Sequence, residues 1–206
     1  MSLVMEMIQN VMKNLHDRKI ENKYFGSREE LVEELLKEIS IEEIVAIGGS
    51  GTVESLGIYD KLIDRGNDVL WHWKVEPEKR MEIFKKALFS DVYLTSCNAL
   101  TEDGKILNID GNGNRVAAMF FGPKKVRIIC GVNKIAKDYD DAMNRIKTVA
   151  CPQNARRLER KTPCAVTENC SDCKSPDRMC TVTTIIEQKP PFVDFKVYIL
   201  NEDIGY

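Results

Sequence analysis

The chain has 206 residues, of which 43% are hydrophobic and 30% are charged, a composition typical of a folded globular protein and not of a disordered one. Thirty Lys and Arg residues against 32 Asp and Glu give a formal net charge of −2, so no basic excess points to nucleic acid or to an anionic membrane as a partner. No run approaches the ~18 consecutive apolar residues that predict a membrane-spanning helix.

The beginning of the chain does not resemble a secretory signal, because Glu6, Gln9 and Lys13 interrupt its apolar residues. We therefore expect a cytoplasmic protein whose seven cysteines are reduced and do not form disulfides. The length predicts one domain over residues 1–206.

Two amphipathic helices are predicted in an N-terminal helical region over residues 1–40. Apolar residues recur at helical spacing over residues 3–19, and their methionine-rich stripe is expected to pack in the core or against a second copy of the chain. Ser27 and Glu30 form a capping box at the start of the second helix.

Short apolar strands then alternate with amphipathic helices. Strands are predicted at 43–47, 68–72, 91–95, 105–108 and 125–130, and helices at 52–64, 77–87, 115–120 and 138–149. This alternation predicts an α/β fold with a mainly parallel sheet covered by helices on both faces. Residues 151–181 break the pattern and are predicted to be a loop-rich, cysteine-rich insert, after which strands resume at 182–187 and 196–200.

The first candidate binding segment is the glycine-rich run 48–57, GGSGTVESLG, between a predicted strand and a predicted helix. Backbone N–H groups of Gly49, Ser50, Gly51 and Thr52 are suited to hold a phosphate or a carboxylate. The run lacks the glycine spacing of a dinucleotide fingerprint and the Gly-Lys-Ser/Thr of a P-loop. It therefore predicts either a cradle for a small anion or simply a tight turn between strand and helix.

A second candidate segment follows the strand at 91–95. Ligands of parallel α/β sheets bind beyond the carboxyl ends of the strands, so Asn98 is expected to face the same pocket as the glycine-rich run. Cys97 is a candidate nucleophile, although a quiet packed cysteine is the simpler interpretation because no histidine lies near it in sequence. His72 is expected to be a satisfied or exposed histidine, and the tryptophans on either side of it are expected to pack rather than to stack on a cofactor.

The third candidate site is a set of four cysteines within the insert, Cys164, Cys170, Cys173 and Cys180. Thiolates are ligands for zinc and for iron–sulfur clusters, and two of them two residues apart can grip one centre from a single turn. The long outer spacings differ from paired zinc knuckles and favour a [4Fe–4S] cluster, with zinc as the alternative. The alternative interpretations are four free cysteines, or a redox pair at Cys170 and Cys173.

With these residues in view, the chain resembles the lactate utilization (LUD) domain family, in its short form with a C-terminal cysteine-rich segment. The resemblance is carried by the glycine-rich run, by residues 98–135, by KTPCAVTENCSDCKSPDRMC at 161–180, and by the ending ILNEDIGY. It implies the NagB/RpiA/CoA-transferase-like α/β fold, in which the glycine loop and the segment equivalent to 95–108 line the ligand site.

The resemblance also bears on chemistry. Related sugar-phosphate isomerases use an aspartate where this chain has Asn98, and an amide cannot act as a general base. Transferases of the superfamily use a glutamate nucleophile, for which Glu54 is the nearest candidate.

The family resemblance implies a part in the oxidation of lactate to pyruvate, alongside iron–sulfur partner proteins. Because the sequence carries no flavin or nicotinamide motif, electron relay, ligand sensing or assembly is the expected role. The rival expectations are a transferase or isomerase acting on a phosphorylated or CoA-linked acid, and a non-catalytic module stapled by zinc.

Overall fold

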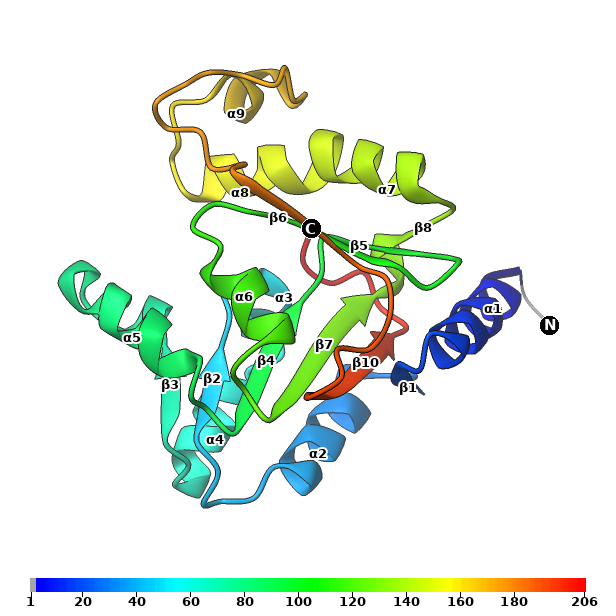
Figure 1. Cartoon of the computed structure of the whole chain (residues 1–206), viewed down its shortest axis with the longest axis vertical. Helices are drawn as coiled ribbons and strands as arrows, with labels where there is room; N and C mark the ends of the chain where they lie inside the picture. The colour runs from blue at the N-terminus through cyan, green and yellow to red at the C-terminus, as the bar shows by residue number, and fades with distance from the viewer. Residues whose placement is uncertain (1–2) are drawn as a thin grey trace.

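The computed structural model, which describes residues 3–206, contains a six-stranded sheet in which all neighbouring strands are parallel (Figure 1). In spatial order its strands are β1 (Glu21–Phe25), β10 (Asp194–Leu200), β7 (Lys125–Gly131), β4 (Val92–Ser96), β2 (Val45–Ile47) and β3 (Val69–Trp71). A smaller mixed sheet has the order β8 (Ile135–Ala136), β5 (Ala99–Thr101), β6 (Ile106–Asp110) and β9 (Val182–Ile186).

Helices cover both faces of the main sheet. On one face lie α1 (Leu3–Asp17) and α6 (Asn114–Phe120), and on the other α2 (Arg28–Glu38), α3 (Gly51–Ser55) and α4 (Ile58–Arg65). Successive strand residues point to opposite faces, so Ile128 packs with the first group and Ile129 with the second, both fully buried. The predicted α/β class, with a parallel sheet between two helical layers, is confirmed.

The remaining helices flank the sheets. They are the 3₁₀ turns η1 (His72–Lys74), η2 (Pro77–Lys79) and η3 (Val132–Lys134), the helices α5 (Arg80–Ala87), α7 (Tyr139–Arg145), α8 (Cys151–Arg157) and α9 (Pro163–Thr167), and the π-helical segment η4 (Ile146–Ala150). Helices α7, α8 and α9 lie together at the top of Figure 1, and α7 packs on the small sheet.

Several predicted elements need correction. The helix expected at 52–64 is split into α3 and α4, because Gly57 adopts a left-handed conformation with φ of 63° between them. The insert does not begin as a loop, since α7, η4 and α8 run on without a break to Arg157. Strand β1 was not predicted: it is a polar edge strand, so it lacks the apolar run that marks a buried strand.

The N-terminal helices agree with their sequence signals. In α1, Ile8, Val11 and Leu15 are buried at helical spacing, and the side chain of Ser27 caps α2 by accepting the backbone N–H of Glu30. Residues 1 and 2 of the predicted region 1–40 lie outside the described residues.

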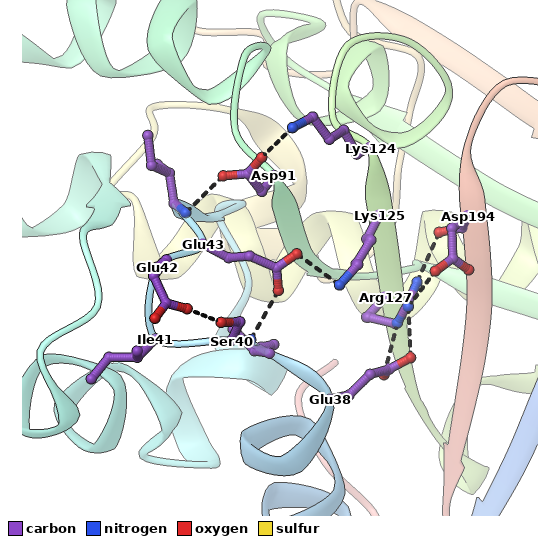
Figure 2. Close-up of polar contacts among 12 residues, drawn as sticks. Glu38, Ser40, Ile41, Glu42, Glu43, Asp91, Lys124, Lys125, Arg127 and Asp194 are labelled. Atoms are coloured by element: carbon purple, nitrogen blue, oxygen red, sulfur yellow. Dashed lines mark hydrogen bonds and ion pairs between the residues drawn. The ribbon is translucent and has the colours of Figure 1, made fainter.

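Charged residues form ion pairs at the edge of the main sheet where its strands begin. Figure 2 shows Arg127 of β7 between Glu38, at the end of α2, and Asp194, at the start of β10. The Arg127 side chain is 1% exposed, and its Nη2 lies 2.7 Å from both carboxylates. Burial opposes ionisation of Glu38, but hydrogen bonds from Arg127, Lys196 and Tyr198 outweigh it and lower the pKa of Glu38 to about 2. This edge is thus occupied by structural ion pairs, which leaves the opposite edge for ligands.

No helix in residues 3–206 is long and apolar enough to span a membrane.

Candidate functional site

The main cavity of the molecule lies at the carboxyl edge of the parallel sheet and has a volume of about 540 Å³. Its walls come from the segments that follow β2, β3, β4 and β7, together with part of the cysteine-rich insert and the C-terminal residue Tyr206. The predicted ligand residues Gly49, Ser50, Gly51, Thr52 and Asn98 all line it, as does Cys97. The topology thus gathers both candidate segments around one space, as expected for an open parallel sheet.

Glu54 is the exception among the candidate residues. It is exposed in the first turn of α3, and it is not among the described residues that line the cavity. The structure therefore places this carboxylate away from the other site candidates.

Glycine is needed at positions 48 and 51 of the loop for different physical reasons. A Cβ on Gly48 would lie 2.8 Å from the hydroxyl of Tyr93, so this glycine is required by packing under the loop. At Gly51, the nearest atom to an added Cβ would be a ring carbon of Tyr206 at 3.9 Å. Gly51 therefore leaves room in the cavity that a larger side chain would fill.

Lys134, which the sequence analysis did not single out, is a buried cation that lines the cavity. It lies in η3 directly after β7, and only 2% of its surface is exposed. Its Nζ donates to Thr52 Oγ1 at 2.7 Å and to Ser96 Oγ at 3.0 Å. Within residues 3–206 no carboxylate forms an ion pair with it. Burial lowers the pKa of Lys134 to about 8, so the ammonium form still predominates at neutral pH.

A buried charge without an opposite charge is costly. An anion in the cavity would remove that cost at Lys134, so the side chain marks the place where a negative group is best accommodated. The signal available in the sequence was the position of Lys134 just beyond the strand KVRIICG, at the same sheet edge as the glycine loop.

Arg115 also lines the cavity and positions Asn98. Its guanidinium pairs with Asp110 at 3.0 Å and donates to Asn98 Oδ1 at 3.1 Å. The same Oδ1 accepts the backbone N–H of Ile109 at 2.9 Å, which fixes the orientation of the amide. No protein acceptor for Asn98 Nδ2 exists in the described part of the chain, so Asn98 is left with a free donor at the cavity.

Cys97 is a buried thiol that is 2% exposed and lines the cavity. A hydrogen bond from the thiol of Cys130 and the positive charges of Lys134 and Arg145 outweigh burial and lower the pKa of Cys97 to about 7. The proton is held on Cys130, whose pKa is raised. The thiolate form of Cys97 is therefore favoured, and it is a second counter-charge for Lys134.

His72 and the tryptophans form an aromatic wall. His72 packs edge-on against Phe84, with ring centroids 4.7 Å apart, and Trp73 stacks on Trp71 at 5.3 Å. Burial, together with the charges of Arg80 and Arg157, lowers the pKa of His72 to about 4, so the imidazole is neutral at physiological pH. The guanidinium of Arg157 lies 4.5 Å from the Trp73 ring centroid, so this ring already has a partner from the protein.

The four predicted metal ligands, Cys164, Cys170, Cys173 and Cys180, all line a second, small cavity of about 20 Å³. Cys180 also lines the main cavity, so the two spaces share a wall. A fifth cysteine that the sequence analysis did not assign, Cys151, places its Sγ 3.5 Å from that of Cys180. All seven cysteines of the chain are free thiols.

The chemistry of this donor set fits a thiolate-bound inorganic centre, because four sulfurs of one segment share a single small space. Their positions do not form a finished single-ion site: within residues 3–206 no three His, Cys, Asp or Glu side chains converge closely enough to hold one metal ion.

Comparisons with known proteins give the family and the fold. The LUD domain family matches residues 8–200. A DUF162 family protein from Deinococcus radiodurans has a similar structure, with a TM-score of 0.55 and 11% sequence identity over 98% of this chain and 100% of that one. The β subunit of eIF2B from Chaetomium thermophilum matches 66% of this chain and 48% of its own, with a TM-score of 0.39 and 14% identity.

A search of curated proteins found no match. The family match extends over nearly all of the chain, from α1 to the end of β10, and includes the glycine loop, Lys134 and the cysteine-rich insert. This chain therefore belongs to the LUD domain family.

Proposed function

We propose that this LUD domain protein takes part in the oxidation of lactate to pyruvate by binding a small anionic metabolite next to a cysteine-bound inorganic centre. The metabolite would occupy the main cavity, with its carboxylate near Lys134, Asn98 and the loop 49–52. The centre, an iron–sulfur cluster by preference and zinc as the alternative, would be held by Cys164, Cys170, Cys173 and Cys180.

The observation that carries this proposal is the buried ammonium group of Lys134. It donates to three neutral acceptors, Thr52 Oγ1, Ser96 Oγ and the carbonyl of Cys97, and it has no carboxylate partner in the described part of the chain. A cavity of this volume is within the usual range for small-molecule sites. Substrates of the lactate reaction are monoanions, and a single buried positive charge is complementary to a monoanion.

Exposed arginines also line the cavity. Arg80, Arg157 and Arg160 line it, and within residues 3–206 none of the three is paired with a carboxylate. Such a surface attracts anions from solution and raises their association rate. It supports an anionic ligand whichever acid is bound.

The proximity of the two spaces supports an electron-relay role. Cys180 lines both the metabolite cavity and the small cavity of the cysteine cluster. An iron–sulfur cluster, when bound, would supply one-electron transfer. The chain's own residues bind and orient the acid and hold the sulfur ligands, and iron–sulfur partner proteins would exchange electrons with the centre.

Ligand-dependent thermal stability tests the metabolite site. At a concentration about 100 times Kd, a ligand stabilises the folded state by about 2.7 kcal/mol, which for a domain of this size is a rise in Tm of roughly 5–10 °C. We expect this rise with lactate or pyruvate, and its loss in Gly51→Val, which fills the cavity. The absence of a shift with lactate, pyruvate or acetyl-CoA would contradict the proposal.

Metal analysis tests the centre. Protein purified without oxygen should be brown, should contain iron and acid-labile sulfide, and should bleach on reduction. A colourless protein with one equivalent of zinc would remove the redox role and leave a structural staple.

A further inference from the structure

We infer that Arg157 of α8 and Arg80 of α5 form a second anion subsite in the main cavity, and that this subsite binds the phosphate group of a phosphorylated carboxylic acid. Both arginines line the cavity, as does Lys134. The inference rests on the proposed function, because it places the carboxylate of the same ligand at Lys134. Such a ligand would bind more tightly than lactate or pyruvate, which have one anionic group each.

The size and charge of the cavity exceed what a small monoanion needs. Its volume is about 540 Å³, and cavities of roughly 300–1,000 Å³ hold much larger ligands than a three-carbon acid. Six cationic side chains line it against two carboxylates, Asp110 and Asp177. Asp110 pairs with Arg115, and Asp177 accepts the backbone N–H of Lys161 at 3.0 Å. The lining therefore keeps more positive charge than one carboxylate neutralises.

Arg157 is held in a fixed orientation by neutral groups. Its Nε donates to the hydroxyl of Tyr206 at 2.7 Å, and its Nη2 donates to Asn154 Oδ1 at 2.8 Å. One face of the guanidinium lies over the Trp73 ring, 4.5 Å from the centroid. These contacts position the side chain without neutralising it, and Nη1 has no acceptor in the described part of the chain. A guanidinium oriented in advance is well suited to bind a phosphate.

Arg80 supplies the second charge. Within residues 3–206 its side chain forms no hydrogen bond or ion pair, although it lines the cavity. Burial is the main cause that lowers the pKa of His72 to about 4, and the charges of Arg80 and Arg157 add to it. Both guanidiniums thus act on the same neutral imidazole. Their combined charge matches a phosphate monoester, which carries about −1.5 to −2 at neutral pH.

The C-terminal residues separate this subsite from Lys134. A Cβ on Gly205 would lie 3.1 Å from Lys134 Nζ, whereas the hydroxyl of the next residue, Tyr206, contacts Arg157. The two subsites are therefore about one tyrosine side chain apart. This separation suits a ligand with an anionic group at each end, and a single carboxylate cannot contact both subsites.

The glycine-rich loop borders both subsites. At one end Thr52 Oγ1 accepts from Lys134 at 2.7 Å. At the other, a Cβ on Gly49 would lie 3.3 Å from the His72 imidazole and 3.5 Å from Trp73 Nε1. The indole N–H has no acceptor within residues 3–206, so it offers a neutral donor beside the arginines.

The test uses glycerate and 3-phosphoglycerate, which differ only by the phosphate group. Their affinities are measured by titration calorimetry on the full chain, in wild type, Arg157→Gln, Arg80→Gln and Lys134→Met. Arg156→Gln is the matched control, because Arg156 is exposed on the same helix but lies outside the cavity lining. Thermal unfolding of each ligand-free variant checks that it is folded.

We expect the wild type to bind 3-phosphoglycerate at least about tenfold more tightly than glycerate. Arg157→Gln and Arg80→Gln should reduce this ratio and leave glycerate affinity unchanged, whereas Lys134→Met should weaken both ligands. Arg156→Gln should bind both like the wild type.

Equal affinities of the wild type for the two ligands, or an equal loss of the ratio in Arg157→Gln and Arg156→Gln, would overturn this inference and leave the proposed function standing. Tighter binding of malate, which carries a second carboxylate, than of 3-phosphoglycerate would overturn the assignment to phosphate. Unchanged 3-phosphoglycerate affinity in Lys134→Met would show that one ligand does not fill both subsites. Failure of lactate, pyruvate and glycerate to bind would instead overturn the proposed function.

Discussion

Replacement of Lys134 by methionine separates the binding role of this residue from any structural one. Methionine has about the same length and no charge, so it fills the space of the lysine side chain without its ammonium group. The variant loses the bonds to Thr52 Oγ1 and Ser96 Oγ, at 2.7 and 3.0 Å. It also removes a buried cation that has no carboxylate partner in the described part of the chain.

Loss of the ammonium group should change stability little and carboxylate binding strongly. The pKa of Lys134 falls from 10.5 to about 8 on folding, which corresponds to about 3 kcal/mol against the buried ammonium. Loss of its two shorter hydrogen bonds, to Thr52 Oγ1 and Ser96 Oγ, acts in the opposite direction by about 3–6 kcal/mol. We expect the free energy of unfolding of the ligand-free variant to fall by no more than about 3 kcal/mol. A carboxylate that loses a charged hydrogen bond of about 1.5–3 kcal/mol should bind about 10- to 150-fold more weakly.

The pH dependence gives a second signature. Because the pKa of Lys134 is lower in the folded state than in the unfolded one, the unfolded chain binds more protons between pH 8 and 10.5. Stability of the wild type should therefore gain a contribution as the pH rises through this window, and Lys134→Met should lack it. Carboxylate binding should follow the opposite trend and weaken above about pH 8 as the ammonium loses its proton.

Titration calorimetry with pyruvate and urea unfolding measure the two effects on the same samples. Lys137→Met is the control, since Lys137 is exposed on the same connection and forms no side-chain ion pair within residues 3–206. Equal pyruvate affinity in wild type and Lys134→Met, or loss of affinity that only tracks loss of stability, would refute the reasoning.

Three further predictions follow from single contacts. Glu38→Gln should destabilise the chain by about 3 kcal/mol in urea, because it leaves Arg127 without its best partner. Since the pKa of Glu38 is lowered from 4.5 to about 2, the wild type should lose this stabilisation as the pH falls through that interval. A difference in stability between wild type and Glu38→Gln that stays constant over this interval would contradict the reasoning. Gly205→Ala should lower the free energy of unfolding by about 1–3 kcal/mol, because φ is +64° and the new Cβ would overlap Thr52 Oγ1. Pyruvate affinity should drop while metal content stays the same, and unchanged affinity would argue against the cavity as the pyruvate site. Glu54→Gln should leave pyruvate binding unchanged, because Glu54 is exposed and outside the cavity lining; a lost activity in this variant would instead revive a transferase mechanism.

Local signals in the sequence were sufficient for most of the fold. Apolar periodicity and the Ser27 cap predicted α1 and α2, and the apolar runs predicted the inner strands, whose residues are buried on both faces. The same reasoning missed β1, since an edge strand is partly solvated and needs no apolar run. It also predicted one continuous helix across Gly57, because the sequence of a periodic segment does not show which φ its glycine adopts.

The candidate site divides in the same way. Glycine spacing and strand order were enough to bring Gly51, Thr52 and Asn98 to one edge of the sheet, and the cavity contains all three. The sequence analysis did not identify Lys134, because a single lysine after a strand gives no sign that it is buried. Its environment is made by Thr52 and Ser96, which lie 82 and 38 residues away in the chain.

The sequence by itself determined the layers of this protein, the sheet edge that carries the candidate site and the segment that carries the thiols, because these depend on periodicity, glycine and residue type, which act over a few neighbours. Only the tertiary structure decided which groups meet. The contact of Cys151 with Cys180 spans 29 residues, and the cradle around Lys134 depends on three separate strand ends. Such contacts arise when parallel strands align their carboxyl ends, and no local pattern encodes the distances between side chains brought together in this way.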